Sequence, residues 1–159
     1  MVPRHSSRLH RGCVDPVPRL AYTRFNVSKP TLIDTRSGRI LEGHQLEPSE
    51  VAQLIVEVAS EKLAADILML DLRGLAPFTD YFIIMSADSP RQIQALEEDL
   101  TAALKEAKLS IHRREGTAAS GWVLMDCSDV IVHIFSPDER DFFGLERLWA
   151  RAAQVVRVL

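Results

Sequence analysis

Residues 121–135 read GWVLMDCSDVIVHIF, and this stretch decides the fold class. Two runs rich in β-branched and aromatic residues flank Cys127-Ser128, which predicts two antiparallel strands joined by a tight turn. If Cys127 and Ser128 form a two-residue turn, each residue of one strand has a defined partner on the other. The expected cross-strand pairs are Trp122 with His133, Leu124 with Ile131, and Asp126 with Asp129.

Alternation along these strands divides their side chains between two faces of a sheet. One face is entirely apolar and must be core: Val123, Met125, Val130, Val132 and Ile134. The other face mixes aromatic, aliphatic and acidic residues, as contact surfaces do. Its candidate partner-binding residues are Trp122, Leu124, Asp126, Asp129, Ile131 and His133, with Phe135 on the same face. The alternative is that a helix covers this face and packs against Trp122; the pattern supports both interpretations equally.

The elements on either side of the hairpin follow from capping signals and apolar spacing. Pro48 suits a first helical turn, and Ser89-Pro90 predicts another helix start. The expected elements are a helix over 48–62, a buried strand over 67–72, a strand over 81–86, a helix over 90–107, a short strand near Ile111, and a last helix opened by the capping box at 136–139. Helices and strands alternate, so we expect an α/β fold with a mixed β-sheet flanked by helices.

The expected domain boundaries lie near both ends of the chain. Residues 1–46 are interrupted by prolines and show no sustained periodicity, which predicts a disordered extension. Arginines at positions 4, 8 and 11 support a second interpretation, in which this segment is an organelle transit peptide. A third interpretation is that translation starts upstream of the domain and adds residues that the domain does not use. Residues 47–150 are expected to form one domain, with residues 151–159 as a short C-terminal tail.

Charge is unevenly distributed along the chain. Residues 1–46 hold eight Lys/Arg against three Asp/Glu, whereas residues 47–159 hold eleven against nineteen, a net charge of −8. An acidic domain is poorly suited to bind nucleic acid, where affinity comes from cations on phosphates. It is better suited to a basic protein surface.

Catalytic and cofactor motifs are absent from the sequence. It contains no phosphate-binding loop, dinucleotide-binding glycine turn, HExxH helix or nucleophile elbow, so we expect neither enzyme activity nor a cofactor. Cys13 and Cys127 form no CxxC pair, which argues against a structural metal site and fits a reducing compartment. Asp71 and Asp80 flank a loop without a third ligand. No apolar run is long enough to span a bilayer.

Three stretches together resemble the Iojap-like ribosomal silencing factors, the RsfS family. They are DLRGLAPFTDYFII (71–84) followed by SPRQ (89–92), GWVLMD (121–126) continuing to DVIVHIF (129–135), and RDFFGLERLW (140–149). The resemblance covers about Pro48 to Trp149. Three positions depart from the family pattern: Ala87 replaces a usual glycine, Cys127-Ser128 replaces an aromatic-glycine turn, and Phe143 stands where tyrosine is common.

The resemblance implies a nucleotidyltransferase-like fold that has lost its catalytic carboxylates. It also implies binding to the large ribosomal subunit through ribosomal protein L-fourteen, which blocks joining of the small subunit and represses translation when nutrients are limiting. Homodimers and a cytoplasmic location are further expectations, with a mitochondrion or plastid as the alternative if residues 1–46 are a transit peptide. The competing hypotheses are a divergent metal-dependent nucleotidyltransferase and a dimerising adaptor for another basic protein.

Overall fold

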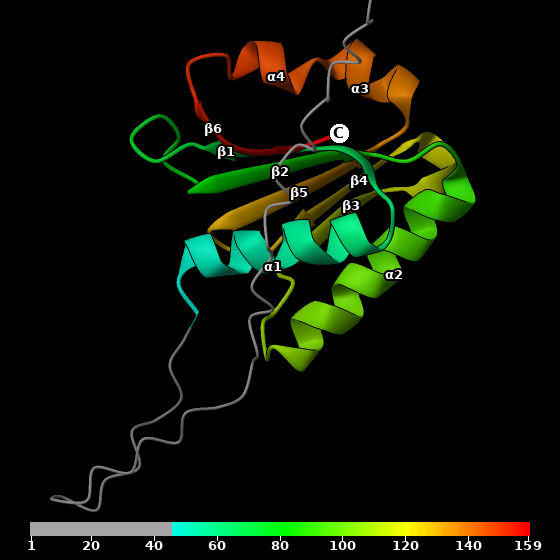
Figure 1. Cartoon of the computed structure of the whole chain (residues 1–159), viewed down its shortest axis with the longest axis horizontal. Coiled ribbons are helices and arrows are strands. Elements are labelled where there is room, and N and C mark those ends of the chain that lie inside the picture. Colours follow the sequence, from blue (N-terminus) through cyan, green and yellow to red (C-terminus); the bar gives the residue numbers. More distant parts are fainter. Residues whose placement is uncertain (1–45) are drawn as a thin grey trace, which may run out of the picture. The chain divides into compact units, whose positions relative to one another are not determined.

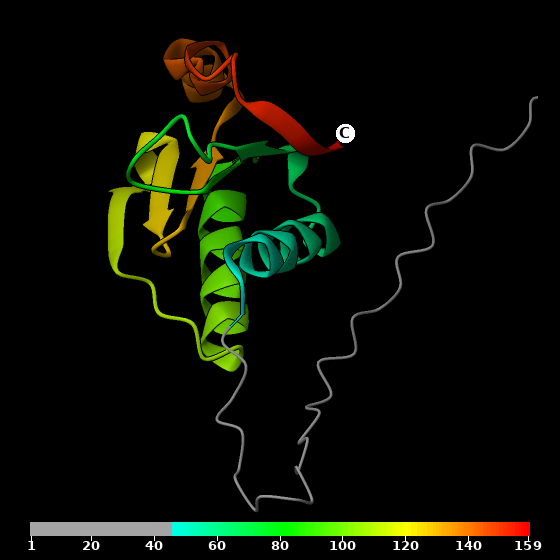
Figure 2. The same ribbon diagram turned by 90° about the vertical axis from the view of Figure 1, so that its left-hand side faces the viewer.

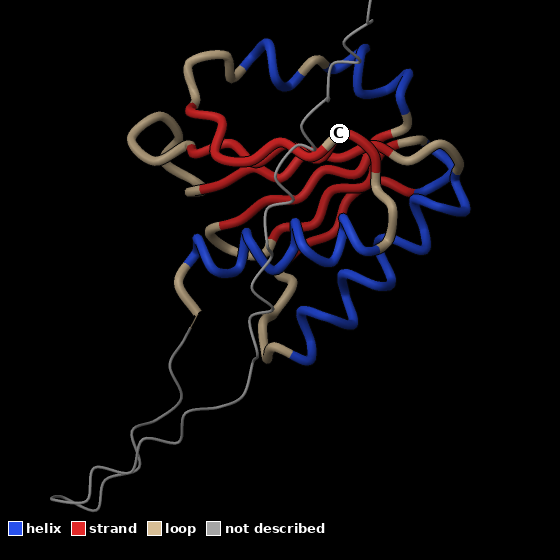
Figure 3. Tube along the Cα trace, viewed as in Figure 1, coloured by secondary structure: helices blue, strands red, loops and turns tan. Residues whose placement is uncertain are grey.

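The computed structural model describes residues 46–159, and the helices and strands alternate along this part of the chain (Figures 1 and 3). The helical elements are α1 (Pro48–Glu61), α2 (Pro90–Glu106), the 3-10 turn η1 (Ala118–Ser120), α3 (Pro137–Phe143) and α4 (Leu145–Leu148). The strands are β1 (Ala65–Asp71), β2 (Tyr81–Ser86), β3 (Arg113–Thr117), β4 (Trp122–Asp126), β5 (Val130–Phe135) and β6 (Ala153–Val158). The disordered extension expected for residues 1–46 falls, apart from Leu46, outside the described residues.

The strands form one six-stranded sheet in the order β3-β4-β5-β2-β1-β6. β2 and β5 pair in parallel, and every other neighbouring pair is antiparallel. The expected mixed sheet is therefore confirmed. The parallel pair requires a crossover, and α2 is the helix in that connection.

Helices cover the sheet from both sides. In Figure 1, α1 and α2 lie below the strands and α3 and α4 lie above them, and Figure 2 shows the same layers from the side. The larger core lies between the sheet and α1 and α2 and includes Ile55, Leu96, Leu100, Val132 and Ile134. A smaller core lies on the other face and consists of Leu68, Leu70, Leu72, Phe82, Ile84 and Phe135.

The two long helices begin where their capping signals lie. Glu47 and Glu50 form a reciprocal capping box at the start of α1, whose first residue is Pro48. At α2 the Ser89 hydroxyl accepts a hydrogen bond from the Gln92 backbone N–H at 3.2 Å. Both predicted helix starts are confirmed.

The hairpin has the expected faces but a different register. Its turn is centred on Ser128-Asp129, because the Cys127 N–H donates to the Val130 carbonyl at 2.9 Å. The observed cross-strand pairs are Trp122 with Phe135, Leu124 with His133, and Asp126 with Ile131. Ser128 is the first of the two turn residues and has φ +71°. Two-residue hairpin turns require a positive φ at this position. The predicted pairs are wrong by two residues, and a two-residue shift leaves each side chain on its predicted face.

The C-terminal residues depart from the expectation of a short tail. Strand β6 pairs antiparallel with β1, with Leu68 opposite Arg157. The last helix divides into α3 and α4 at Gly144, whose φ of +52° ends the first helix.

Strand β3 begins two residues beyond the strand expected near Ile111, and all of its residues are exposed. Within residues 46–159 no helix is long and apolar enough to cross a membrane.

Candidate docking surface

The six residues predicted to bind a partner lie along β4, β5 and the turn between them. β4 supplies Trp122, Leu124 and Asp126 to the face that α3 and α4 approach, whereas β5 supplies Ile131 and His133 to it and Asp129 lies in the turn. The opposite face of the same strands is buried, with Val123 and Met125 at most 1% exposed. The predicted division into a core face and a mixed face is therefore confirmed.

The mixed face is only partly covered. Trp122, Leu124, Asp126 and Ile131 are half-buried and Asp129 is exposed. His133 is only 4% exposed, which differs from the exposed position that the pattern suggested. It lies beneath the surface and supports the residues around it.

His133 is held among aromatic rings. The Trp122 indole Nε1–H donates to its Nδ1 at 3.3 Å, and the Phe82 ring packs edge to face with it at 4.9 Å between centroids. Burial lowers the pKa of His133 to about 4, because no charge nearby compensates for the lost water. Its imidazole is therefore neutral at pH 7. Since Nδ1 accepts a hydrogen bond, the ring proton belongs on Nε2, which has no hydrogen-bond partner among the described residues.

Exposed aromatic side chains border the mixed face, and pattern reasoning missed their role. Phe143 packs against Trp122 at 4.6 Å between centroids, and Phe142 packs edge to face on Phe143 at 5.2 Å. On the other side Phe78, from the loop between β1 and β2, packs against Phe82 at 6.3 Å. The exposed fractions are 79% for Phe142, 56% for Phe78 and 40% for Phe143. The sequence did hold a signal for Phe142 and Phe143: both are apolar and adjacent in a helix of seven residues. A helix that short cannot bury adjacent apolar side chains, which point in different directions.

We define the docking surface as these aromatic residues together with the exposed part of the hairpin face. Its members are Phe78, Trp122, Leu124, Asp126, Asp129, Ile131, Phe142 and Phe143. Exposed aromatic groups beside polar ones are typical of protein-binding sites.

Acidic groups at the turn give the docking surface a negative edge. Asp126 accepts a hydrogen bond from the Ser128 backbone N–H at 3.0 Å. Within residues 46–159, no Lys or Arg forms an ion pair with Asp126 or Asp129. Neither acid faces the other across the ladder, so the repulsion expected from the predicted register does not arise.

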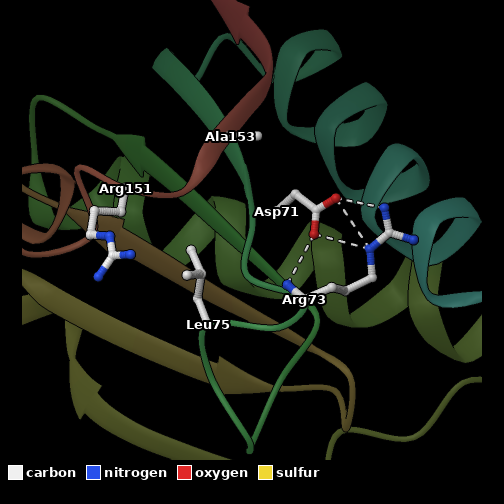
Figure 4. Close-up of a pocket in the computed structure, with 5 residues that line it drawn as sticks. All are labelled: Asp71, Arg73, Leu75, Arg151 and Ala153. Atoms are coloured by element: carbon white, nitrogen blue, oxygen red, sulfur yellow. Dashed lines mark hydrogen bonds and ion pairs between the residues drawn. The ribbon is translucent and has the colours of Figure 1, made fainter.

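The remaining candidate chemical groups are tied up in local contacts. Asp71 is bound by Arg73, with Nη2 2.6 Å from Oδ2, and this hydrogen bond lowers the pKa of Asp71 (Figure 4). The two residues line an open hollow of about 560 Å³ together with Leu75, Arg151 and Ala153. The part of the chain described by the structure holds no group of three or more His, Cys, Asp or Glu placed to bind a metal.

Cys127 is similarly unsuited to chemistry. Burial and the neighbouring Asp126 raise the pKa of its thiol to about 11. The reactive thiolate form is therefore scarce at neutral pH.

Comparisons with known proteins agree with this architecture. A family model described as "Ribosomal silencing factor during starvation" matches residues 45–158. A ribosomal silencing factor RsfS from Halalkalibacterium halodurans is 37% identical over 106 residues, which is 67% of this chain and 91% of that protein. The chloroplastic protein Iojap of Zea mays is 36% identical over 101 residues, covering 64% of this chain and 44% of Iojap. A crystal structure of a protein from Chromobacterium violaceum superposes with a TM-score of 0.64 at 34% identity, covering 70% of this chain and 94% of that one.

The sheet order, the two helical layers and the mixed hairpin face define a small α/β domain that presents one aromatic and acidic surface. The chain belongs to the ribosomal silencing factor (RsfS) family.

Proposed function

We propose that this chain binds the large ribosomal subunit through ribosomal protein L-fourteen, prevents the small subunit from joining, and so represses translation when nutrients are limiting. The observation that carries the proposal is the docking surface: exposed aromatic rings beside unpaired carboxylates, on a domain of the RsfS family. Residues 47–159 carry a net charge of −8, which complements a basic ribosomal protein.

Each part of the docking surface has a distinct expected role. Aromatic residues often supply most of the binding energy of an interface, and Trp122, on which Phe143 packs, is the expected anchor here. Asp126 and Asp129, at the edge, are placed to speed association with a basic partner. His133 contributes from beneath by accepting the Trp122 indole hydrogen bond.

The test is affinity for isolated ribosomal protein L-fourteen, measured on folded variants. Trp122→Ala should weaken binding by about 2 kcal/mol or more. It should also lower stability, because Trp122 stacks on Phe135 and His133, so folding is checked by circular dichroism first. A folded Trp122→Ala variant that binds as tightly as wild type would contradict the proposed anchor.

Charge reversal tests the acidic edge. Asp126→Lys combined with Asp129→Lys should slow association, and the loss should shrink at high salt. Glu98→Lys combined with Glu106→Lys is the matched control, because both residues are exposed acids on α2, on the other side of the sheet, and the change in net charge is the same. Equal slowing by the control would show that net charge, rather than this edge, governs the encounter.

An enzyme is the alternative from another class, a divergent metal-dependent nucleotidyltransferase. Such an activity needs carboxylates that converge on a metal ion. Asp71 is bound to Arg73, and Asp126 is bonded to its own turn. Labelled nucleotide incorporation that is lost in Asp71→Ala or Asp126→Ala would establish the enzyme and overturn our proposal. A dimerising adaptor for another basic protein is the third hypothesis, and the identity of the protein captured from ribosomal extracts distinguishes it from the first.

Location and assembly complete the proposal. We expect the chain to act in the cytoplasm, the compartment of bacterial ribosomes, and to form homodimers in solution. The alternative is an organelle, since the chain is similar to a protein named as chloroplastic Iojap and begins with a basic segment. Fusing residues 1–46 to a reporter tests the transit peptide, and sedimentation equilibrium of the purified chain tests the dimer.

A further inference from the structure

The α3–α4 segment, residues 137–148, makes few apolar contacts with the sheet: Phe143 packs on Trp122 and Phe135, and Leu145 packs against the smaller core. Arg140 is the one buried residue of α3, and α4 has none. Phe142 and Leu148 point their apolar side chains to solvent, at 79% and 72% exposure. Few apolar side chains of α3 and α4 are therefore buried, and a polar contact adds to what holds this segment on the sheet.

Arg140 makes that contact. Its side chain is almost fully buried, and its Nε donates to Glu146 Oε1 in α4 at 2.6 Å. Its Nη1 donates to the Asp66 carbonyl in β1 at 2.7 Å and to the Ser86 hydroxyl in β2 at 2.9 Å. Its Nη2 lies 3.3 Å from Asp66 Oδ2. One guanidinium thus joins both short helices to two central strands.

Strand β1 has an irregularity at Asp66, the residue that Arg140 contacts. The register between β1 and β2 shifts between Ala65 and Leu68, and Asp66 lies at this bulge with φ +43°. A bulge redirects backbone groups out of the ladder, and here the Asp66 carbonyl accepts from Arg140. Arg157 of β6 binds the Asp66 carboxylate at 2.9 Å, so the partner of Arg140 is itself held.

We infer that Arg140 is a positioning residue for the docking surface: it holds α3 and α4 against the sheet so that Phe143 packs on Trp122 and Phe142 packs on Phe143. The inference deepens the proposed function and rests on it. The geometric link is short, because Phe142 and Phe143 follow Arg140 by two and three residues in the same helix. The planar guanidinium reaches acceptors on three elements, which the single amine of lysine cannot do at once.

A purely structural role for Arg140 gives different measurements. If Arg140 only stabilised the fold, its removal would lower global stability and leave the affinity of the folded fraction unchanged. If it positions the aromatic residues, the folded protein should bind more weakly, and Phe142 should lose its contribution in the absence of Arg140. A double-mutant cycle separates the two roles.

The experiment compares wild type, Arg140→Met, Phe142→Ala and the double variant in the full chain, by affinity for isolated large ribosomal subunits. We expect each single variant to weaken binding about five- to tenfold and the double variant to be little worse than either. Arg91→Met is the matched control, because Arg91 is an exposed arginine of α2, on the other side of the sheet from α3 and α4, and it should bind as wild type does. Additive losses, or unchanged affinity of folded Arg140→Met, would overturn the inference.

Hydrogen exchange of the free protein gives a second readout that needs no partner. Arg140→Met should speed exchange of the amides in residues 137–149 and leave those of β2 and β5 protected. Faster exchange throughout the domain, or no change in 137–149, would contradict a positioning role. If Arg140→Met does not fold, Glu146→Gln is tested in its place, because that substitution weakens the hydrogen bond between Arg140 and α4. Unchanged affinity of folded Glu146→Gln would then refute the inference.

These outcomes also distinguish the inference from the proposed function. A wild-type chain that does not bind large subunits refutes the proposed function. Weakened binding by Trp122→Ala together with normal binding by Arg140→Met refutes the inference alone.

Discussion

Acid should destabilise the domain through His133. The histidine is buried among Phe82, Trp122 and Phe135, and burial lowers its pKa from 6.5 to about 4. The unfolded chain therefore binds a proton at this site at a higher pH than the folded chain does. Above pH 6.5 neither state is protonated there and His133 adds no pH dependence. As the pH falls from 6.5 towards 4, the unfolded state gains the proton first, so the free energy of unfolding decreases.

The magnitude follows from the two pKa values of this residue. Within that window each pH unit removes at most about 1.4 kcal/mol of stability, since one pKa unit corresponds to that free energy. Between pH 7 and pH 5 the loss from His133 is about 2 kcal/mol. Such a loss is a large fraction of the 5–15 kcal/mol or so that stabilises a typical domain.

The assay is urea unfolding at a series of pH values from 7.5 to about 5, for wild type, His133→Phe and His112→Gln. His133→Phe keeps an aromatic ring in the site and removes the titrating group, so its stability should fall less steeply with acid. His112 is exposed, and its variant should follow the wild-type curve. Parallel curves for wild type and His133→Phe would refute the argument, because carboxylates elsewhere would then account for the whole acid effect.

The remaining predictions concern packing, backbone and thiol chemistry. Val123→Ala should lower stability by about 2 kcal/mol and leave the partner affinity of the folded protein intact. Leu124→Ala should weaken partner binding and change stability less. Thermal unfolding and binding measured on the same samples check both. Gly116→Ala should destabilise by more than about 1 kcal/mol in urea unfolding, because its φ is +78° and an added Cβ would strike a backbone carbonyl of β4. Cys127 should react slowly with a thiol reagent at pH 8 in a Cys13→Ser background and quickly after unfolding, because burial raises its pKa to about 11; rapid reaction of the folded chain would contradict this.

Much of the fold was predictable because local signals agreed with it. Period-two alternation assigned the faces of β4 and β5 correctly even though the predicted turn was wrong, since a shift of two residues preserves facing. The helix starts at Pro48 and Ser89 also followed from capping chemistry alone. Such features depend on neighbours in the chain, so no knowledge of tertiary contacts was needed.

Strand β6 escaped prediction and β3 was predicted only approximately, near Ile111, because pairing, rather than pattern, creates them. β3 is an edge strand with every residue exposed, so it has no buried face to leave an apolar pattern. β6 gains its order from hydrogen bonds to β1, far away in the sequence. The turn position also depended on tertiary contacts: the Asp129 carbonyl accepts hydrogen bonds from the backbone N–H groups of Asp80 and Tyr81.

The candidate site was predictable in part. The hairpin residues were identified from their alternation, but burial of His133 depends on rings contributed by other elements. The aromatic border at Phe78, Phe142 and Phe143 depends on how the loop after β1 and the α3 helix lie against the sheet. The position of α3 in turn depends on the contact of Arg140 with Asp66, 74 residues earlier in the chain. A contact of that range leaves no local signal in sequence.

Sedimentation of the purified chain with separated ribosomal subunits tests the central claim most directly. The chain should pellet with large subunits and remain in the supernatant with small subunits, at a salt concentration that suppresses nonspecific charge contacts. Its presence should also prevent added small subunits from joining the large ones. Equal sedimentation with both subunits, or with neither, would contradict the account.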